Sequence, residues 1–263
     1  AIMSAHLLNQ AGATDPLAGM ASGEYRVGIA FSVFVGSRKG AVTESDSELS
    51  GQSLYALDAS ADAYLVALAD GRIYMVESEH LDRTLLTTID TTRSVCELNF
   101  DLTPACLVTE DAQLVRDTLY RGRAIQAADT LGAAQYMLDQ AVAYSLDRKQ
   151  FNRAIGSFQA VKHMCAEMAS QLEPCRAFAW YAGHAFDEST EDAAETACHA
   201  KAHLSEVGQF VAKTSTEVHG GMGFTDLVGL HYWFKRIGFN RQLLGSPEAV
   251  RHEVAVLQGL CEA

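Results

Sequence analysis

Positive charge is scarce in this sequence. It contains 20 Lys and Arg residues against 33 Asp and Glu residues, which gives a formal net charge of −13 at pH 7. Nucleic-acid binding is driven by clustered Lys and Arg side chains that displace counterions from phosphates. The shortage therefore excludes nucleic acid as an expected partner, and any polyanionic ligand has to be met by a local basic site.

Long apolar runs and closely paired cysteines are also missing. No segment reaches the ~18–20 apolar residues of a membrane span, and Ala1 to Gly12 lacks the pattern of a signal peptide. The six cysteines form no CxxC pair, and a 263-residue chain that is 48% hydrophobic can bury a core without disulfides. We therefore expect a cytoplasmic, globular protein with reduced cysteines and no membrane partner.

The pattern of the chain changes near residue 108. Before it, apart from a short helix in Ala1 to Gln10, short β-branched or alternating runs are broken by Gly, Asp and Ser, which indicates an antiparallel sheet or small barrel. The predicted strands are Tyr25 to Val35, Ala63 to Leu68, Arg72 to Glu77, Ser94 to Asn99 and Ala105 to Val108. The turn Ala69-Asp70-Gly71 predicts a hairpin between two of them.

After residue 108 the apolar residues recur at helical spacing, and the predicted helices are long. They are Glu110 to Arg148, Ser157 to Phe186 with Ser157 as N-cap and a kink at Pro174, Glu191 to His219, Leu227 to Ile237, and Pro247 to Leu260. Helices well above the ~11-residue average fit an antiparallel bundle. The sequence thus predicts a β domain followed by a helical bundle.

A basic segment ends the first long helix. Arg148, Lys149 and Arg153 place three cations within six residues of an acidic protein. Arginine offers a planar fork that matches phosphate oxygens, so a pyrophosphate is a reasonable ligand. The alternative is that Arg148 and Lys149 complement the negative C-terminal end of their own helix.

A glycine-rich segment follows about 70 residues later. Gly220, Gly221 and Gly223 lie within four positions after His219. Glycines let backbone N–H groups approach a ligand closely, as in phosphate-binding loops. Taken alone, the segment is better explained as a helix stop with a tight turn.

In combination and in this order, these segments resemble the acyl-CoA dehydrogenase family. The family pattern has Arg-x-Gln-Phe-Gly, then Phe-Gln-x-Val-x-His, then Gln-x-His-Gly-Gly-x-Gly-Phe-Thr, then a His-x-x-x-Lys-Arg run. The corresponding residues here are Arg148 to Phe151, Phe158 to His163, His219 to Thr225 and His231 to Arg236. The resemblance extends from about Ala1 to Leu260.

The resemblance implies an α+β fold with a middle antiparallel β domain and a C-terminal four-helix bundle. It implies the division 1–20 as a remnant of an N-terminal helical domain that is otherwise mostly absent, 21–108 as the β domain and 109–263 as the bundle. It also implies FAD as cofactor, with the ADP and pyrophosphate part held across a subunit interface. The implied cofactor-binding residues are Arg148, Gln150, Phe151, Phe158, His219, Gly220, Gly221 and Gly223, and Phe158 is equally well explained by core packing.

The catalytic carboxylate of the family is missing from both of its usual positions. The family removes an α proton of an acyl-CoA thioester with a Glu, while hydride leaves for the flavin. One position, in a Tyr-Glu-Gly-Thr segment, is Leu244 here, and the other, 26 residues before the motif Arg, is Gly122. We therefore expect no catalytic residue in this chain.

The flavin-ring segment and two motif positions also depart from the family. Gly-x-Lys-x-Trp-Ile-Thr-Asn reads Gly51 to Asp58 here, and Leu57 in place of Thr removes a hydroxyl that could bond the ring. Asn152 replaces a Gly, and Glu217 replaces a Gln at a place where a carboxylate would repel a pyrophosphate unless it points away. The chain's own flavin pocket is thus in doubt.

This chain keeps the motifs that reach across the subunit interface but lacks the catalytic ones. In this respect it is similar to the non-catalytic subunit of the heterotetrameric acyl-CoA dehydrogenases that actinobacteria use on CoA-linked cholesterol side chains. The resemblance implies a catalytic partner subunit in an α2β2 assembly that acts on an acyl-CoA in steroid degradation. Two other hypotheses stay open. One is a self-sufficient enzyme with a relocated base at Glu248, Glu217 or Asp226, and the other is a flavin-free scaffold subunit.

A metal site is not expected. Cys198, His199 and His203 fall on one predicted helix, but no convincing fourth ligand accompanies them.

Overall fold

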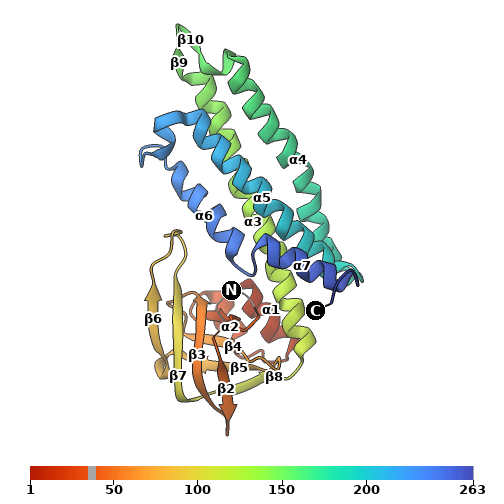
Figure 1. The fold of residues 1–263 in the computed structure, drawn as a ribbon. Helices are drawn as coiled ribbons and strands as arrows, with labels where there is room; N and C mark the ends of the chain where they lie inside the picture. Colours follow the sequence, from red (N-terminus) through yellow and green to blue (C-terminus); the bar gives the residue numbers. More distant parts are fainter. Residues whose placement is uncertain (35–39, 263) are drawn as a thin grey trace. The chain divides into compact units, whose positions relative to one another are not determined.

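The computed structural model describes residues 1–34 and 40–262, which form two compact units, Ala1–Gly122 and Arg123–Ala263 (Figure 1). The last strand, β8 (Cys106–Thr109), is followed at once by the long helix α3 (Ala112–Asp147), so the change of structure predicted near residue 108 is confirmed. The helix α3 runs from the first unit into the second. The division into three domains stays a prediction.

The first unit is an eight-stranded sheet with two short helices, α1 (Ile2–Gln10) and α2 (Leu17–Ser22). The strands are β1 (Val27–Ala30), β2 (Val42–Ser45), β3 (Glu48–Leu57), β4 (Ala63–Ala67), β5 (Ile73–Glu77), β6 (Asp82–Leu86), β7 (Val95–Pro104) and β8. Their order is β6-β7-β3-β1-β4-β5-β8, with β2 on β3. The pairing is antiparallel except between β1 and β4, which run parallel.

The predicted hairpin at Ala69-Asp70-Gly71 is confirmed. It joins β4 to β5, the N–H of Leu68 donates to the carbonyl of Arg72 at 2.9 Å, and Gly71 adopts φ 92°, a value that L side chains disfavour.

The centre of the sheet is buried on both faces, as shown by β4, of which every residue is buried. Tyr64 and Val66 belong to one apolar cluster, whereas Leu65 packs into a second cluster that contains Leu7 and Leu8 of α1. Side chains alternate between the two faces of a strand, so a fully apolar strand indicates cover on both sides. The helix α1 supplies part of that cover.

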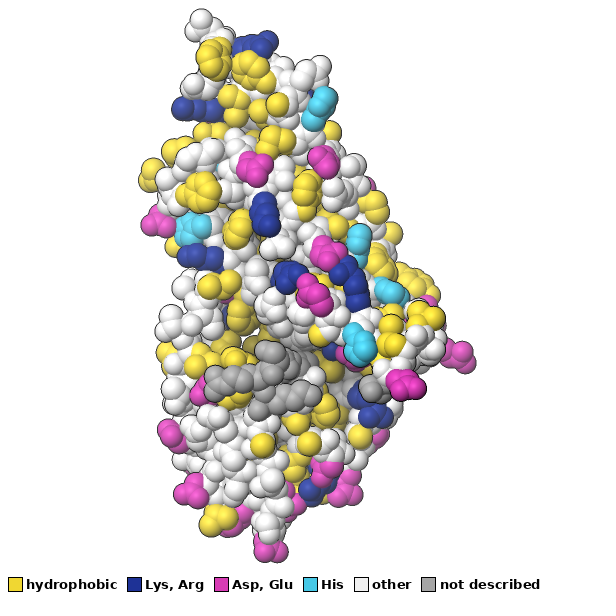
Figure 2. All heavy atoms as spheres, in the orientation of Figure 1, with side chains coloured by type: hydrophobic (Ala, Val, Ile, Leu, Met, Phe, Trp, Pro, Cys, Tyr) yellow, Lys and Arg dark blue, Asp and Glu magenta, His cyan; other side chains and the backbone are white. Residues whose placement is uncertain are grey.

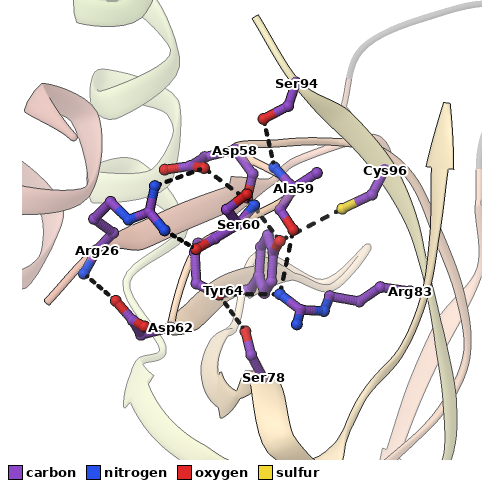
Figure 3. Close-up of polar contacts among 11 residues, drawn as sticks. Arg26, Asp58, Ala59, Ser60, Asp62, Tyr64, Ser78, Arg83, Ser94 and Cys96 are labelled. Atoms are coloured by element: carbon purple, nitrogen blue, oxygen red, sulfur yellow. Dashed lines mark hydrogen bonds and ion pairs between the residues drawn. The ribbon is translucent and has the colours of Figure 1, made fainter. Parts of the chain in front are cut away.

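Two arginines hold the loop that connects β3 to β4. Figure 3 shows Arg26 and Arg83 on opposite sides of this loop. Arg26 donates to the carbonyl of Ser60 and bonds Asp62 through its backbone N–H, while Arg83 donates to the carbonyls of Ala59 at 3.3 Å and Ala61 at 3.1 Å. The two arginines thereby supply donors to the backbone carbonyls of residues 59–61, and the carbonyl of Ala61 also accepts from the hydroxyl of Ser78 at 2.7 Å.

The second unit consists of the rest of α3 and four further helices: α4 (Gln159–Asp187), α5 (Ala193–His219), α6 (Leu230–Gln242) and α7 (Pro247–Leu257). The helices predicted from apolar periodicity are confirmed, with ends that differ by a few residues. The helix α5 lies at the centre and packs against α4, α6 and α7. Pro174 lies inside α4.

One predicted cap is wrong. Ser157 does not cap α4, because its hydroxyl donates to the carbonyl of Ala154 at 2.7 Å within a short 3-10 turn. The helix begins two residues later with Phe158 as N-cap, and no side chain caps it.

The predicted strands differ most from the observed ones where the observed strand is polar or contains bulges. The polar β2 and β6 and the long β3 were not predicted; β3 is interrupted by bulges that break the alternation of its side chains. The predicted first strand ends at Ala30, and its expected end at Val35 lies outside the described residues.

Candidate functional site

The basic segment forms a tight hairpin at one end of the helical unit, which the sequence analysis missed. Its strands are β9 (Lys149–Gln150) and β10 (Arg153–Ala154), joined by Phe151 and Asn152 with φ values of 51° and 61°. Two positive φ values define a type I′ turn, which favours Asn-Gly. Phenylalanine is strained in this conformation, and here its side chain is 87% exposed.

The pairing of the hairpin decides which side chains share a face. Gln150 lies directly opposite Arg153, and the N–H of Ile155 donates to the carbonyl of Arg148 at 2.8 Å. Because side chains alternate along a strand and opposed residues point the same way, Arg148, Gln150 and Arg153 lie on one face. Lys149 lies on the other.

The cations of this hairpin have no acidic partner among the described residues. Of the arginines that the structure describes, only Arg148 and Arg153 make neither a hydrogen bond nor an ion pair through the guanidinium group. Arg153 instead lies over the ring of Phe158, 3.9 Å from its centroid. Phe151 meets the same ring edge-on at 6.1 Å. Figure 2 shows cationic and hydrophobic side chains side by side at the end where Figure 1 labels β9 and β10.

The glycines of the second motif serve two different purposes. Gly220 ends α5 with φ 58° and ψ −139°, a backbone conformation that suits glycine, and both Gly220 and Gly221 face open space. Gly223 is buried, and a Cβ there would lie 2.9 Å from the carbonyl oxygen of Thr216. Gly220 and Gly221 can therefore admit a ligand, whereas Gly223 permits close packing of the turn against α5.

His219 joins the glycine-rich segment to the basic hairpin. Its ring is 3% exposed, donates from Nδ1 to the carbonyl of Ser215 at 2.7 Å, and stacks on Tyr144 with ring centroids 4.6 Å apart. The carbonyl of Tyr144 accepts from the N–H of Arg148 at 2.9 Å, one helical turn later. The structure thus brings the start of the glycine segment to within one turn of Arg148, although the two are some 70 residues apart in sequence.

Comparison with known proteins identifies the family. The family model described as acyl-CoA dehydrogenase, C-terminal domain, matches residues 112–256. The chain belongs to the acyl-CoA dehydrogenase family. That match covers all of α3 and extends through nearly the whole of α7, so it includes both motifs described above.

Curated proteins of this family are similar to the chain in sequence. The acyl-CoA dehydrogenase IpdE2 of Mycolicibacterium smegmatis is 34% identical over 160 residues, which cover 61% of this chain and 48% of that protein. The caffeyl-CoA reductase-Etf complex subunit CarC of Acetobacterium woodii is 36% identical over 107 residues, 41% of this chain and 28% of that protein. The matched stretches thus span half or less of these relatives' own length.

Two solved structures share the fold across nearly the whole chain. The Tcur3481-Tcur3483 steroid acyl-CoA dehydrogenase superposes with a TM-score of 0.87 at 24% identity, covering 99% of this chain and 76% of that chain. Butyryl-CoA dehydrogenase from Megasphaera elsdenii superposes with a TM-score of 0.86 at 20% identity, covering 98% and 75%. The predicted acyl-CoA dehydrogenase-like α+β fold is therefore confirmed.

Both positions at which acyl-CoA dehydrogenases are expected to carry their base are buried and lie next to one arginine. Leu244 is 4% exposed, and Gly122 is buried in α3. Arg123, the residue after Gly122, donates from Nε to the carbonyl of Leu244 at 2.9 Å and pairs with Glu253 at 2.7 Å. The arginine thus holds the loop of Leu244, the position at which the resemblance led us to expect the family carboxylate.

The three carboxylates considered as relocated bases lie in exposed positions. Asp226 pairs with His231 at 3.3 Å, and Glu217 is exposed on α5. Glu248 stands in the first turn of α7, where hydrogen bonds from its own N–H, Ser246 and Arg241 lower its pKa to about 2. A carboxylate with so low a pKa is a weak base near neutral pH.

The segment expected to contact a flavin ring lies in the irregular strand β3. Gly51 has φ 120° and Tyr55 has φ 57°, and the pairing with β7 shifts between Ser53 and Ala56. Tyr55 stands where the family has Trp, and its side chain is 44% exposed. Leu57, which replaces the family Thr, is half-buried and offers no hydrogen-bond donor.

The rest of the helical unit has an open cleft of about 450 Å³ away from both motifs, lined by Pro174, Phe178, His199, Ala202, His203 and Arg251. Arg251 already pairs with Glu206. Among the described residues, no three His, Cys, Asp or Glu side chains are grouped so as to hold a metal ion. Within the same part of the chain, no helix combines the length and the apolar character required to cross a membrane.

Sequence reasoning missed one residue of the candidate site, Tyr144, which precedes Arg148 by one helical turn. It counted Arg153 among the three cations of the basic segment but did not include it among the cofactor-binding residues. A type I′ turn at Phe151-Asn152, had it been recognised, would have placed Arg153 opposite Gln150.

Proposed function

We propose that this chain is the non-catalytic subunit of a heteromeric FAD-dependent acyl-CoA dehydrogenase, and that it holds the ADP and pyrophosphate part of an FAD whose flavin ring lies in a catalytic partner subunit. The single observation that carries the proposal is a pair of arginines, Arg148 and Arg153, that lie on one hairpin of an acidic protein and have no acidic partner among the described residues. Exposed guanidinium groups without carboxylate partners suit the two phosphates of a dinucleotide.

The described residues fit the ADP and pyrophosphate part of FAD. Arg148 offers a fork of donors on the hairpin face, and Gly220 and Gly221 leave open backbone at the end of α5. The stack of His219 on Tyr144 ties these two parts together. Glu217, three residues before Gly220, is exposed on α5.

Bound FAD would accept the hydride that leaves the β carbon of the acyl group. The residues of this chain would hold and orient the phosphates but would not remove the α proton, because Leu244 and Gly122 cannot accept one. The partner subunit would therefore supply the carboxylate, and an α2β2 assembly would carry the shared sites. The similarity to a structure described as a steroid acyl-CoA dehydrogenase supports, as substrate, a steroid whose side chain is linked to CoA as a thioester.

The proposal is tested by flavin content. The chain is co-expressed with a catalytic acyl-CoA dehydrogenase subunit from its native host, and bound FAD per complex is measured from the visible spectrum for the wild type and for Arg148→Ala. We expect substantial loss of FAD in the variant and desaturase activity in the wild-type complex but not in this chain alone. Unchanged FAD in the variant would refute the cofactor role.

Two further outcomes address the other hypotheses. A colourless complex that stays assembled would support a flavin-free scaffold. Desaturase activity in this chain alone, abolished by Glu248→Gln, would support a relocated base; the low pKa of Glu248 argues against that outcome.

A further inference from the structure

One cation of the hairpin is not accounted for by the family motif. The motif ends at the position of Asn152, yet Arg153 follows it directly on β10. Its guanidinium group makes no polar contact with any residue that the structure describes, and its Cζ lies over the ring of Phe158, 3.9 Å from the centroid.

The hairpin register places Arg153 beside the motif residues. Directly opposed residues in an antiparallel pair have Cβ atoms about 4.5–5.5 Å apart, and diagonal neighbours about 7–8 Å apart. Gln150 is directly opposite Arg153, and Arg148 is the diagonal neighbour on the same face. Long, flexible arginine side chains that start from positions at this separation can each reach one phosphate of a diphosphate.

Resting on the proposed function, we propose that Arg153 is a second phosphate-binding residue of the composite FAD site, and that Phe158 positions its guanidinium group. This changes the role of Phe158 from a direct cofactor contact to a platform. One face of the Phe158 ring is covered by Arg153, and its neighbour Phe151 approaches the ring edge-on. A guanidinium group stacked on an aromatic ring keeps its N–H donors free in the plane, so the stack orients Arg153 without using up its hydrogen-bonding capacity.

Lys149 provides a matched control within the same hairpin. It is exposed like its neighbours, but the alternation of the strand turns its side chain to the opposite face. Arg148→Gln, Arg153→Gln and Lys149→Gln each remove one positive charge. Comparing the three variants therefore distinguishes the loss of a specific phosphate contact from a general loss of positive potential around the hairpin.

The experiment titrates the flavin-depleted complex of this chain and its catalytic partner with FAD, and in parallel with FMN, which lacks the adenosine monophosphate part. We expect Arg153→Gln to weaken FAD binding on the order of tenfold, as for loss of a charge-assisted hydrogen bond. FMN binding should stay unchanged, and Lys149→Gln should bind FAD within about twofold of the wild type. Size-exclusion chromatography and circular dichroism of each variant show that the complex is assembled and folded.

The positioning role of Phe158 is tested by a double-mutant cycle. Phe158→Leu should weaken FAD binding about as much as Arg153→Gln, the double variant should be no weaker than either single one, and Phe158→Tyr should retain wild-type affinity because it keeps the ring. Additive effects would show that Phe158 acts independently of Arg153 and would overturn the platform role.

The outcomes distinguish this inference from the proposed function. If Arg148→Gln weakens FAD binding while Arg153→Gln behaves like Lys149→Gln, Arg153 is not a phosphate ligand and the proposed function stands. If none of the three variants changes FAD binding, both proposals fail together. If all three variants weaken FAD binding equally, the cause is long-range electrostatics and not a specific contact. That result would also overturn the role of Arg153.

Discussion

The ring of His219 stacks on the ring of Tyr144, with centroids 4.6 Å apart and an interplanar angle of 26°. The contact joins the end of α5 to the last turns of α3, from residues 75 positions apart in sequence. Arg148 lies one turn after Tyr144, and Gly220 directly follows His219. The stack therefore positions the two motifs of the candidate site relative to each other, and its loss should affect both stability and ligand binding.

Replacing His219 by Ala should lower both the thermal stability and the flavin content. Truncation of a buried ring removes packing and the stack, which together cost about 2 kcal/mol, and frees the glycine segment from α3. Differential scanning fluorimetry and the visible spectrum of the complex measure the two effects. His184→Ala is the control, because His184 is exposed on α4 and its truncation should change stability by less than about 0.5 kcal/mol. A His219→Ala complex with wild-type Tm and FAD would contradict the linking role.

Replacing Phe151 by Gly should reduce FAD binding without lowering the thermal stability. The side chain of Phe151 is 87% exposed, and its φ of 51° is unfavourable for a residue with a Cβ. Relief of about 1–2 kcal/mol of backbone strain is offset in part by about 0.4–1 kcal/mol from the greater freedom of glycine in the unfolded chain. We therefore expect a Tm equal to or slightly above the wild type together with reduced FAD occupancy. A marked fall in Tm would show that Phe151 is a packing residue instead.

The hydrogen bonds of Glu248 should appear as a pH-dependent contribution to stability. Its pKa falls from an ordinary 4.5 to about 2 in the folded chain, chiefly through hydrogen bonds from its own N–H and from Ser246. A carboxyl whose pKa is lower in the folded state stabilises it fully above pH 4.5, and this contribution disappears as the pH falls through about 2. The difference in stability between wild type and Glu248→Gln should thus shrink between those values.

The comparison in that experiment is Glu188→Gln. Glu188 is exposed after the end of α4 and has no ion pair with any residue that the structure describes. Urea unfolding at several pH values should give a difference for Glu188→Gln that does not follow the same course. Parallel curves for the two variants would show that the hydrogen bonds of Glu248 contribute nothing measurable.

The cysteines should differ sharply in their reactivity toward iodoacetamide. Cys106 and Cys261 are exposed, whereas Cys175 and Cys198 are buried. Burial raises the pKa of Cys198 to about 11, and only the thiolate reacts. Mass spectrometry after a short exposure at pH 8 should find Cys106 and Cys261 modified and Cys198 intact. Rapid modification of Cys198 in the native protein would show that the helical unit opens around it.

Much of the helical unit could be predicted from the sequence, because apolar residues at helical spacing have to face a core wherever the helix lies. Less of the sheet could be predicted. The strand β4 was predicted from its apolar run, but β6 is polar at an edge, and the bulges of β3 destroy the alternation on which strand prediction depends. The small hairpin around Phe151 was missed because neither turn residue is glycine.

Of the candidate site, the sequence determined the chemical groups: the arginines, the glycines and the absence of a carboxylate at Leu244 and Gly122. Only the tertiary structure decided how they are arranged. It buried His219 against Tyr144, and it used Gly223 for packing while leaving Gly221 open. It also turned Arg153 to the same side as Arg148, because the face on which a strand residue lies depends on the position of the turn and on the pairing across it, which composition and spacing do not specify.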